Sequence, residues 1–401
     1  MTGLAGPVYS NQMKAICLHN ATLLSGYAKM EKCGLLIQDG RIADVFLERR
    51  FAQKKLPDNT QIIDVMGCYV SPGFIDTHIH GFAGFGTEDL SAEAIVAMSE
   101  PLGRFGVTSF CPTIYPMARD DMLKAIRAVV EASGKETGAR IAGIHLEGPF
   151  LSPARLGVQR PEFLSPVDLD FMKAMVEAGQ GRITNMTVAP ELKGMRELAL
   201  YCLSQEIVLQ AGHTDATYEN MVEGMQAGIL HSTHFFNAMS RLHHRDPGAV
   251  GAILIHPELS CEIIADGHHV HPELVKLLVR DKPRSKVVLV TDALKPTAQT
   301  VGPLFANNEE VELRDGFFKR KKDDVIAGSA LTMLAGVKNL ADWGIPLEDV
   351  VEMAALNPAR VLNMTLRGQL TPGYHADIAI FDRDFSLKAC LVEGRFVHNA
   401  F

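Results

Sequence analysis

This sequence carries no paired cysteines, no long apolar run and no excess of positive charge. Its seven cysteines are scattered and form no Cys-x-x-Cys pair, which argues against a disulfide framework or a thiolate zinc site and favours a reducing, cytoplasmic location. No apolar run approaches the ~20 residues of a membrane helix, and the first residues lack the pattern of an export signal. The formal net charge of −8, without a basic stripe, argues against nucleic acid as a partner. The sequence therefore predicts a cytoplasmic protein that binds neither membranes nor nucleic acid.

What is present is a globular composition with a regular alternation of strand-like and helix-like segments. The 401 residues are 47% hydrophobic and 21% charged, which is enough for a large core. Eight short runs have the composition of strands: Val70–His78, Val107–Pro112, Arg140–Leu146, Ile183–Ala189, Ile207–His213, Leu230–His234, Cys261–Ala265 and Lys286–Thr291. Between them, segments with apolar residues at helical spacing predict helices: Ala92–Phe105, Asp120–Ala132, Pro166–Ala178, Met195–Ser204, Tyr218–Ala227 and Pro272–Arg280.

Eight alternating units of this kind are typical of a closed parallel barrel. Residues 70–365 are therefore predicted to form a (β/α)8 TIM-like barrel of the α/β class. The alternative is an open, doubly wound sheet, but no Gly-x-Gly-x-x-Gly turn follows the first strand, which argues against a dinucleotide-binding sheet. The segment after the sixth strand is short and rich in histidine and arginine, so we expect a loop there.

Both ends of the chain have a different pattern of short β runs separated by turn residues. These runs are Ala15–Leu18, Gly34–Gln38, Ile42–Phe46 and Gln61–Val65 near the start, and Ala376–Phe381 and Lys388–Val392 near the end. Because they flank the barrel, we expect residues 1–69 and 366–401 to form one composite β-sandwich domain. A separate N-terminal module is the alternative, although ~55 residues make a marginal core by themselves.

Polar residues that suit metal binding stand at the carboxyl ends of the predicted barrel strands. His78 and His80 are two residues apart, so an extended strand turns both imidazoles to the same side. Further residues of this kind end later strands: Glu147, His213, His234 and Asp292. A barrel builds its active site at this face, and a carboxylate with two histidines and an open position is a catalytic ligand set. The sequence therefore predicts a hydrolytic metal site.

Several motifs resemble those of the amidohydrolase superfamily and occur in the same order. They are Gly73–His80 (GFIDTHIH), His145–Phe150 (HLEGPF), Gly212–Thr214 (GHT), Thr233–Met239 (THFFNAM) and Thr291–Ala293 (TDA). The inner motifs, together with His243–Gly248 (HHRDPG), Ala265–His269 (ADGHH) and Ala327–Met333 (AGSALTM), are similar to the N-acetylglucosamine-6-phosphate deacetylase family. The resemblance implies hydrolysis of N-acetyl-D-glucosamine 6-phosphate to D-glucosamine 6-phosphate and acetate.

The resemblance also implies a role for each polar strand-end residue. Glu147, His213 and His234 would bind a divalent metal ion, and two further ligands, His78 and His80, make a second ion possible. Imidazole and carboxylate ligands admit Zn²⁺, Fe²⁺, Mn²⁺ or Co²⁺, so the identity and number of the ions stay open. The catalytic Asp292 would take a proton from the attacking water and later deliver it to the leaving amine.

For the sugar phosphate, the resemblance implies a further set of binding residues: Val158, Gln159, Asn237, Ala238, Arg245, His269, Ala327, Gly328 and Ser329. Arg245 is the candidate for the phosphate, because its planar guanidinium fits phosphate oxygens in a fork. Gln159 stands where many relatives have a histidine, so it donates a hydrogen bond but carries no charge. In relatives the Arg245 loop reaches a neighbouring subunit, which implies a homodimer.

Two other functions stay open on the sequence alone. A different amidohydrolase, acting on an N-acyl amino acid or a cyclic amide, shares the broad motifs, but the Arg245 context favours a sugar phosphate. A catalytically inactive scaffold of the same fold is the other alternative. Such a scaffold typically loses ligands, whereas all six strand-end residues are intact here.

Overall fold

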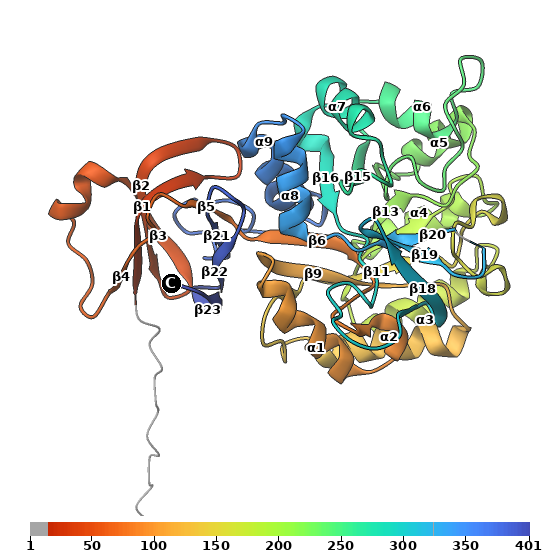
Figure 1. Cartoon of the computed structure of the whole chain (residues 1–401). Helices are drawn as coiled ribbons and strands as arrows, with labels where there is room; N and C mark the ends of the chain where they lie inside the picture. Colours follow the sequence, from red (N-terminus) through yellow and green to blue (C-terminus); the bar gives the residue numbers. More distant parts are fainter. Residues whose placement is uncertain (1–14, 324) are drawn as a thin grey trace, which may run out of the picture.

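The computed structural model describes residues 15–323 and 325–401, which form a small β domain beside a large barrel (Figure 1). Both ends of the described chain belong to the small domain, and strand β6 runs from it into the barrel (Figure 1). The predicted fold class is confirmed. Across this described part of the chain, no helix is long and apolar enough to cross a membrane.

The small domain is an eight-stranded sheet to which both ends contribute. Its strands are β1 (Ile16–Leu24), β2 (Lys29–Gln38), β3 (Arg41–Leu47), β4 (Gln61–Asp64), β5 (Tyr69–Pro72), β21 (Ile378–Phe381), β22 (Leu387–Val392) and β23 (Arg395–Asn399). They follow the order β23-β22-β21-β5-β1-β2-β3, with β4 beside β1. The two ends meet where β21 pairs antiparallel with β5, with Ile380 opposite Val70. Both of these side chains are buried in the core of the domain, so neither end completes it without the other.

Two details of the small domain differ from the expected runs. The predicted first barrel strand, Val70–His78, is divided around Gly73: β5 lies in the terminal sheet and β6 in the barrel. A Cβ at Gly73 would lie 2.1 Å from Cγ2 of Thr108, so only glycine permits this close approach of the two chains. The strand β23 after the turn at Glu393 was not predicted. Residues 1–14 lie outside the described residues, and the domain limits at 69/70 and 365/366 stay predictions.

The eight predicted barrel strands are present and parallel. They are β6 (Phe74–Ile79), β9 (Val107–Ile114), β11 (Ile144–Glu147), β12 (Ile183–Val188), β13 (Val208–Ala211), β14 (His231–Ser232), β15 (Ser260–Ile264) and β16 (Val287–Val290). Each strand pairs with the next one in this order from β6 to β16. The predicted run Arg140–Leu146 is divided, because Arg140–Ile141 (β10) pairs only with β9 before β11 begins.

Helices cover the outside of the barrel. The longer ones are α1 (Ala92–Gly103), α2 (Arg119–Ala132), α3 (Leu169–Gly179), α4 (Met195–Ser204), α5 (Tyr218–Gln226), α6 (Gly248–Ile255), α7 (Pro272–Asp281) and α8 (Met333–Asp342). Three short segments follow without a break: α9 (Leu347–Val351), a π-helical turn (Glu352–Leu356) and α10 (Asn357–Val361). All six predicted helices are therefore present. The loop expected after the sixth strand exists but leads into α6, which was not predicted because Gly248–Ile255 is apolar on every face.

A small antiparallel sheet is inserted between the eighth barrel strand and α8. Its strands are β17 (Phe305–Ala306), β18 (Glu309–Arg314), β19 (Phe317–Arg320) and β20 (Ile326–Ser329). The sequence analysis did not predict this insertion. Its last strand lies beside the end of β16, because Ala293 and Ser329 form a parallel bridge. The insertion therefore reaches the carboxyl-end face of the barrel.

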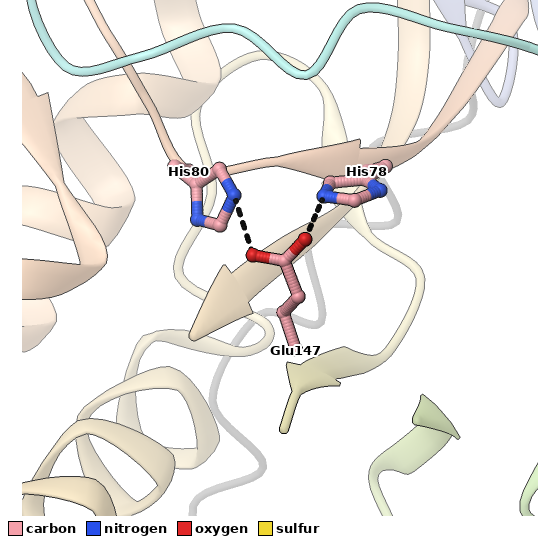
Figure 2. A group of neighbouring side chains, drawn as sticks. All are labelled: His78, His80 and Glu147. Carbon is pink, nitrogen blue, oxygen red and sulfur yellow. Dashed lines mark ion pairs between the residues drawn. The ribbon is translucent and has the colours of Figure 1, made fainter. Parts of the chain in front are cut away.

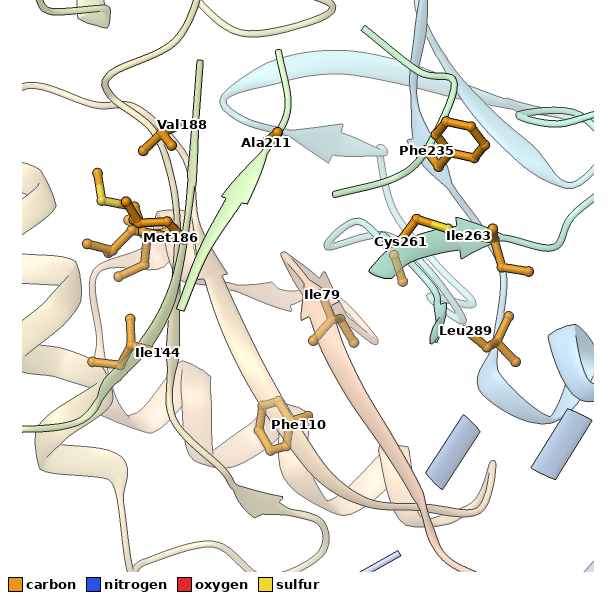
Figure 3. Packing of buried hydrophobic residues seen from close by; sticks show 14 of the residues in the cluster. Ile79, Phe110, Ile144, Met186, Val188, Ala211, Phe235, Cys261, Ile263 and Leu289 are labelled. Atoms are coloured by element: carbon orange, nitrogen blue, oxygen red, sulfur yellow. The ribbon is translucent and has the colours of Figure 1, made fainter. Parts of the chain in front are cut away.

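The main apolar core lies between the barrel strands and the surrounding helices (Figure 3). Strand residues such as Ile144 and Met186 share this cluster with Ile126 of α2 and Met172 of α3. Since side chains alternate along a strand, the intervening residues point into the barrel. Many of these are polar and buried, and they bond across the barrel interior between strands that are not neighbours. The interior beneath the site is therefore a hydrogen-bonded polar layer.

The barrel closes where β6 meets β16, and this closure positions the site. The backbone N–H of Asp292 donates to the carbonyl of His78 at 2.9 Å, and the N–H of His80 donates to the carbonyl of Ala293 at 2.9 Å. The fully buried Asp76 carboxylate accepts from the hydroxyl and the N–H of Thr291 at 2.6 and 3.2 Å. These bonds hold the ends of the first and last strands side by side.

Candidate metal centre

The predicted site residues leave their strands in a consistent way. Glu147 is the last residue of β11, whereas His213, His234 and Asp292 each stand two residues beyond the ends of β13, β14 and β16. The backbone at these three residues is left-handed, with φ of 45°, 21° and 50°. Such a conformation is uncommon for residues other than glycine and persists only where the surroundings impose it. Here it occurs where the chain turns away from the strand.

Glu147 joins the two histidines of the first strand (Figure 2). Its Oε1 lies 3.5 Å from Nε2 of His78, and its Oε2 lies 3.4 Å from Nε2 of His80. The three residues are at most 2% exposed. Among the residues that the structure describes, they form one of two groups of histidine and carboxylate ligands that lie close enough together to hold a metal ion.

The second group shares the same carboxylate. Oε1 of Glu147 lies 3.1 Å from Nε2 of His213 and 3.1 Å from Nε2 of His234. The two imidazole Nε2 atoms are themselves 3.1 Å apart. Glu147 thus belongs to both groups and stands between two pairs of histidines.

The orientation of the imidazoles fits a cation at the centre of the cluster. Nδ1 of His80 lies 3.1 Å from the carbonyl oxygen of Thr113, and Nδ1 of His213 lies 3.0 Å from that of Arg155. A carbonyl only accepts, so each Nδ1 carries a hydrogen and each Nε2 faces the cluster, where it can bind either a proton or a metal ion. Nε2 of His78 is buried and has no hydrogen-bond partner. Lone pairs that converge at such distances need a cation between them, and imidazole with carboxylate suits a divalent metal.

Asp292 lies against the same two histidines as Glu147. Its Oδ1 is 3.5 Å from Nε2 of His78 and 3.4 Å from Nε2 of His80, and its side chain is 13% exposed. Burial works to raise the pKa of Asp292, but the charges of His78 and His80 outweigh it and lower the pKa below the ordinary value. The carboxylate is therefore ionised at neutral pH and available to accept a proton.

Glu147 is ionised for the same reason. Burial works to raise its pKa, but the charge of His213 and the close imidazoles of His213, His234 and His78 hold the pKa well below the ordinary value. In return, the carboxylates Asp292 and Glu147 raise the pKa of His78 and of His80 above the ordinary value despite burial. The cluster therefore balances its negative carboxylates with positive charge, which a bound cation also supplies.

Several buried residues around the cluster were not predicted. His145 on β11 lies 3.1 Å from Oγ1 of Thr113, and burial together with the charge of His78 holds the pKa of His145 well below its usual range. The ring of Tyr115 stacks on that of His80, with centroids 3.7 Å apart and planes 5° apart. Glu262 on β15 lies 3.0 Å from Nδ1 of His78. A charged residue inside the apolar run Cys261–Ala265 was a signal that could have identified Glu262.

A cavity opens above the ligand cluster. Most of the predicted sugar-phosphate residues line it: Val158, Gln159, Asn237, Ala238, His269, Ala327 and Gly328. Nε2 of Gln159 donates to Oε2 of Glu147 at 2.5 Å, so Gln159 lies directly over the cluster. Nδ1 of His269 lies 2.6 Å from the carboxylate of Asp266, which stands two residues beyond β15 and holds the imidazole in place.

Two of the predicted residues do not line the cavity. Ser329 is fully buried, and its hydroxyl donates to the carbonyl of Thr291, so its side chain secures the β20 end to the strand β16. Arg245 is exposed on the loop between β14 and α6, where Nη1 lies 3.0 Å from Nε2 of His244. Within this single chain, Arg245 is not brought to the cavity.

Comparison with known proteins agrees with this geometry. The sequence model of the amidohydrolase family matches residues 69–397. The chain is 32% identical over 385 residues to an N-acetylglucosamine-6-phosphate deacetylase of Lysinibacillus sphaericus, covering 95% of this chain and 97% of that protein. It is 33% identical over 386 residues to the N-acetylglucosamine-6-phosphate deacetylase of Bacillus subtilis, covering 95% and 94%.

A solved structure extends the likeness to three dimensions. It is a mutant of the N-acetyl-D-glucosamine-6-phosphate deacetylase of Mycobacterium smegmatis in complex with N-acetyl-D-glucosamine-6-phosphate. The two chains superpose with a TM-score of 0.88 at 27% identity, covering 96% of this chain and 99% of the other. The fold, the site and both kinds of comparison therefore lead to one conclusion: the chain belongs to the amidohydrolase family and, within it, to the N-acetylglucosamine-6-phosphate deacetylases.

Proposed function

We propose that this protein removes the acetyl group of N-acetyl-D-glucosamine 6-phosphate by hydrolysis, giving D-glucosamine 6-phosphate and acetate. The observation that carries the proposal is the convergence of four imidazoles and two carboxylates at the base of one cavity. The similarity to deacetylases over nearly the whole chain supports the choice of substrate. An inactive scaffold is not favoured, because these residues are all in place. An amidohydrolase of another substrate class is not favoured either, because the similarity to deacetylases extends over nearly the whole chain.

We assign the ligand roles by the two groups. Glu147, His213 and His234 hold one divalent ion, and His78 and His80 with the shared Glu147 hold a second. The distances within each group and the outward Nδ1 bonds support both assignments. When bound, such an ion polarises the acetamide carbonyl and lowers the pKa of water. Zn²⁺, Fe²⁺, Mn²⁺ and Co²⁺ all suit these ligands.

Asp292 is the residue that moves the proton. Its carboxylate is ionised and faces the cluster, so one of its oxygens accepts a proton from the attacking water. The same carboxyl group then donates that proton to the nitrogen of the leaving amine. Gln159, whose Oε1 is buried and has no partner, lies over Glu147 and offers its amide to the acetamide group.

The sugar phosphate occupies the cavity above the cluster. Val158, Gln159, Asn237, Ala238, His269, Ala327 and Gly328 line the space in which we place the sugar. The position of Ser329 supports the wall indirectly, through the end of β20. Arg245 lies outside this space, so we propose that it binds the phosphate in the site of a second copy of the chain, in a homodimer.

We place the enzyme in the cytoplasm. All seven cysteines are free and buried, which is the usual state in a reducing compartment. The amino-sugar phosphate substrate is negatively charged, and so is the protein, with a net charge of −8. Positively charged groups near the site therefore have to attract the substrate.

Removal of metal tests the proposed function. Dialysis against a chelator should abolish acetate release from N-acetyl-D-glucosamine 6-phosphate, and each candidate ion added back singly should show which of them restore it. Circular dichroism should stay unchanged, because the apolar core lies between strands and helices and the ligands occupy only one end of the barrel. Acetate release should be far slower with unphosphorylated N-acetylglucosamine. The rate of acetate release from the C4 epimer of the substrate measures the specificity for the sugar. Full activity in metal-free protein would contradict the mechanism, and equal rates with and without phosphate would contradict the substrate.

A further inference from the structure

Glu262 is a buried acid at the centre of the polar layer beneath the candidate metal centre. The side chain is fully inaccessible and lies on β15, across the barrel interior from His78 on β6. Its Oε2 lies 3.0 Å from Nδ1 of His78 and accepts a hydrogen bond from Oγ1 of Thr233 at 2.8 Å. Its Oε1 accepts from Oγ1 of Thr77 at 3.2 Å and from Nε2 of Gln210 at 3.4 Å. Both carboxylate oxygens are therefore saturated with donors.

The charge of Glu262 needs an explanation, because a buried carboxylate destabilises the folded protein unless a nearby cation compensates its charge. In the described part of the chain its ion pairs are with imidazoles, His78 at 3.0 Å and His231 at 3.7 Å, and not with lysine or arginine. A neutral glutamine of the same size could accept from one threonine hydroxyl with its amide oxygen and donate to the other hydroxyl with its amide nitrogen. The hydroxyl and amide contacts alone thus do not require an acid, whereas the imidazoles do.

His78 differs from the other ligand histidines in the partner of its Nδ1. Nδ1 of His80 and of His213 each face a neutral backbone carbonyl. Nδ1 of His234 is buried without a partner. Only His78, among these four, has a carboxylate behind it. A carboxylate in this place fixes the ring orientation, keeps the hydrogen on Nδ1 and makes Nε2 a stronger donor to a metal ion.

We infer that Glu262 is a positioning residue that aims Nε2 of His78 at the metal ion held by His78, His80 and Glu147. This inference rests on the proposed function, since it takes the second ion from it. It adds to that function a residue that touches neither substrate nor metal and acts through His78, although its Oε2 also accepts from the backbone N–H of His234 at 3.3 Å. Loss of its charge should weaken the binding of this ion and leave the ion at His213 and His234 in place.

The test is metal binding by the Glu262→Gln variant, measured by elemental analysis and by chelator competition with Zn²⁺ and Mn²⁺. Glutamine keeps the size and one acceptor oxygen but removes the charge. The dissociation constant of the ion at His78, His80 and Glu147 should rise about 10- to 100-fold, the usual effect of removing such a partner. Acetate release should fall at limiting metal and return in excess metal, whereas general structural damage would not be rescued. Glu262→Leu removes the acceptor entirely and should have the larger effect; if it does not fold, Glu262→Gln decides.

Two controls separate positioning from structural damage. Ser232→Ala removes a buried hydroxyl without a hydrogen-bond partner, in the strand position before Thr233, and should leave metal binding and activity unchanged. In a double-mutant cycle, Glu262→Gln added to His78→Ala should change nothing further at this ion, because the imidazole through which Glu262 acts is removed.

The outcomes also separate this inference from the proposed function. Unchanged metal binding in Glu262→Gln, equal loss of both ions, or an additive effect in the cycle would overturn the positioning role. A wild-type stoichiometry of one ion would overturn it as well, while the deacetylase activity could still be measured. Conversely, a wild-type protein that binds two ions but releases no acetate would contradict the proposed function alone.

Discussion

Glu147 is the residue on which the candidate site converges. Its two carboxylate oxygens lie within 3.5 Å of four imidazole Nε2 atoms, and its own chain position is the last residue of a barrel strand. No other residue of the cluster contacts all four histidines in this way among the described residues. A rigid strand end thus places the shared ligand, and the residues just beyond the other strands are turned toward it.

Asp292 should be essential to the chemical step but not to substrate binding. Asp292→Asn keeps the shape of the side chain and removes the proton acceptor, so kcat should fall by at least ~10²-fold, the usual scale of general acid-base catalysis. Steady-state kinetics of acetate release give kcat and KM, and metal content is measured in the same samples. A rise in KM with kcat unchanged would instead make Asp292 a binding residue.

Arg245 should discriminate the phosphorylated substrate. Arg245→Ala should lower kcat/KM for N-acetyl-D-glucosamine 6-phosphate by roughly 30- to 1000-fold, because a fork of charge-assisted hydrogen bonds to phosphate contributes about 2–4 kcal/mol. The slow reaction of the unphosphorylated sugar should barely change. Kinetics on both sugars, with the mass of the protein in solution determined by light scattering, check the role and the dimer together.

Arg241 supplies the matched control for this measurement. It is an equally exposed arginine on the same loop, so Arg241→Ala removes the same charge from the same surface. It should affect both sugars little. Equal losses on both sugars in Arg245→Ala would show a structural role, and a monomer with full activity would contradict phosphate binding across a dimer.

At the scale of elements, the inserted sheet β17–β20 is joined to the barrel at Glu88. Oε1 of Glu88 accepts from the N–H of Asn307, in the turn between β17 and β18, at 3.0 Å. Its Oε2 is buried without a partner. Burial raises the pKa of Glu88 to about 7, more than the charges of Lys295 and His80 lower it. The same insertion carries Ala327 and Gly328 to the cavity, so this contact supports one wall of the site.

The raised pKa predicts a pH-dependent stability. The unfolded chain loses the Glu88 proton near its ordinary pKa of 4.5, whereas the folded protein keeps it up to about 7. The contribution of Glu88 to stability is therefore fully present below pH 4.5 and is lost as the pH rises through about 7. This shift of about 2.5 pKa units corresponds to at most about 3.5 kcal/mol of unfolding free energy, since one pKa unit corresponds to about 1.4 kcal/mol.

Glu88→Gln should remove this dependence, because glutamine still accepts from Asn307 but never ionises. The Tm of the variant minus the Tm of the wild type should therefore be larger at pH 8.5 than at pH 5.5. The difference in Tm between the two proteins at each pH, from calorimetry, measures this directly. A constant difference across the range would show that Glu88 does not titrate in this window.

At the scale of the whole molecule, the two ends of the chain stabilise each other through the terminal sheet. Ile380 on β21 is fully buried and stands opposite Val70 on β5. Ile380→Ala should lower the free energy of unfolding by about 2–4 kcal/mol, because it leaves a cavity in this core. Chemical denaturation monitored by circular dichroism measures the loss. Activity well below the unfolding transition should be retained, since the candidate site lies at the carboxyl ends of the barrel strands.

Ile62 provides the control for this change. It lies in the same sheet, on β4, but is 53% exposed. Ile62→Ala should therefore change the free energy of unfolding by no more than about 0.5 kcal/mol. Similar losses of unfolding free energy in the two variants would show that burial of Ile380 does not stabilise the terminal sheet.

Much of the architecture could be predicted from the local spacing of apolar residues. Eight strands and six helices followed from runs such as Val107–Pro112 and Asp120–Ala132, because side-chain period reports which face of an element is buried. The α6 segment and the inserted sheet were missed for the same reason. Gly248–Ile255 has no polar face to give a helical period, and strands β17–β20 are short and partly exposed.

The sequence by itself determined the kinds of residue at the site, since His-x-His and the strand-end residues Glu147 and Asp292 could be recognised from their positions. Only the tertiary structure decided which groups meet. Closure of β6 against β16 brings Asp292 to His78 from more than 200 positions away, and the barrel interior brings Glu262 behind the same imidazole. The fold likewise leaves Arg245 outside the cavity of its own chain. Periodicity records only the face on which a side chain lies, whereas contacts across a closed barrel depend on the register and curvature of all eight strands.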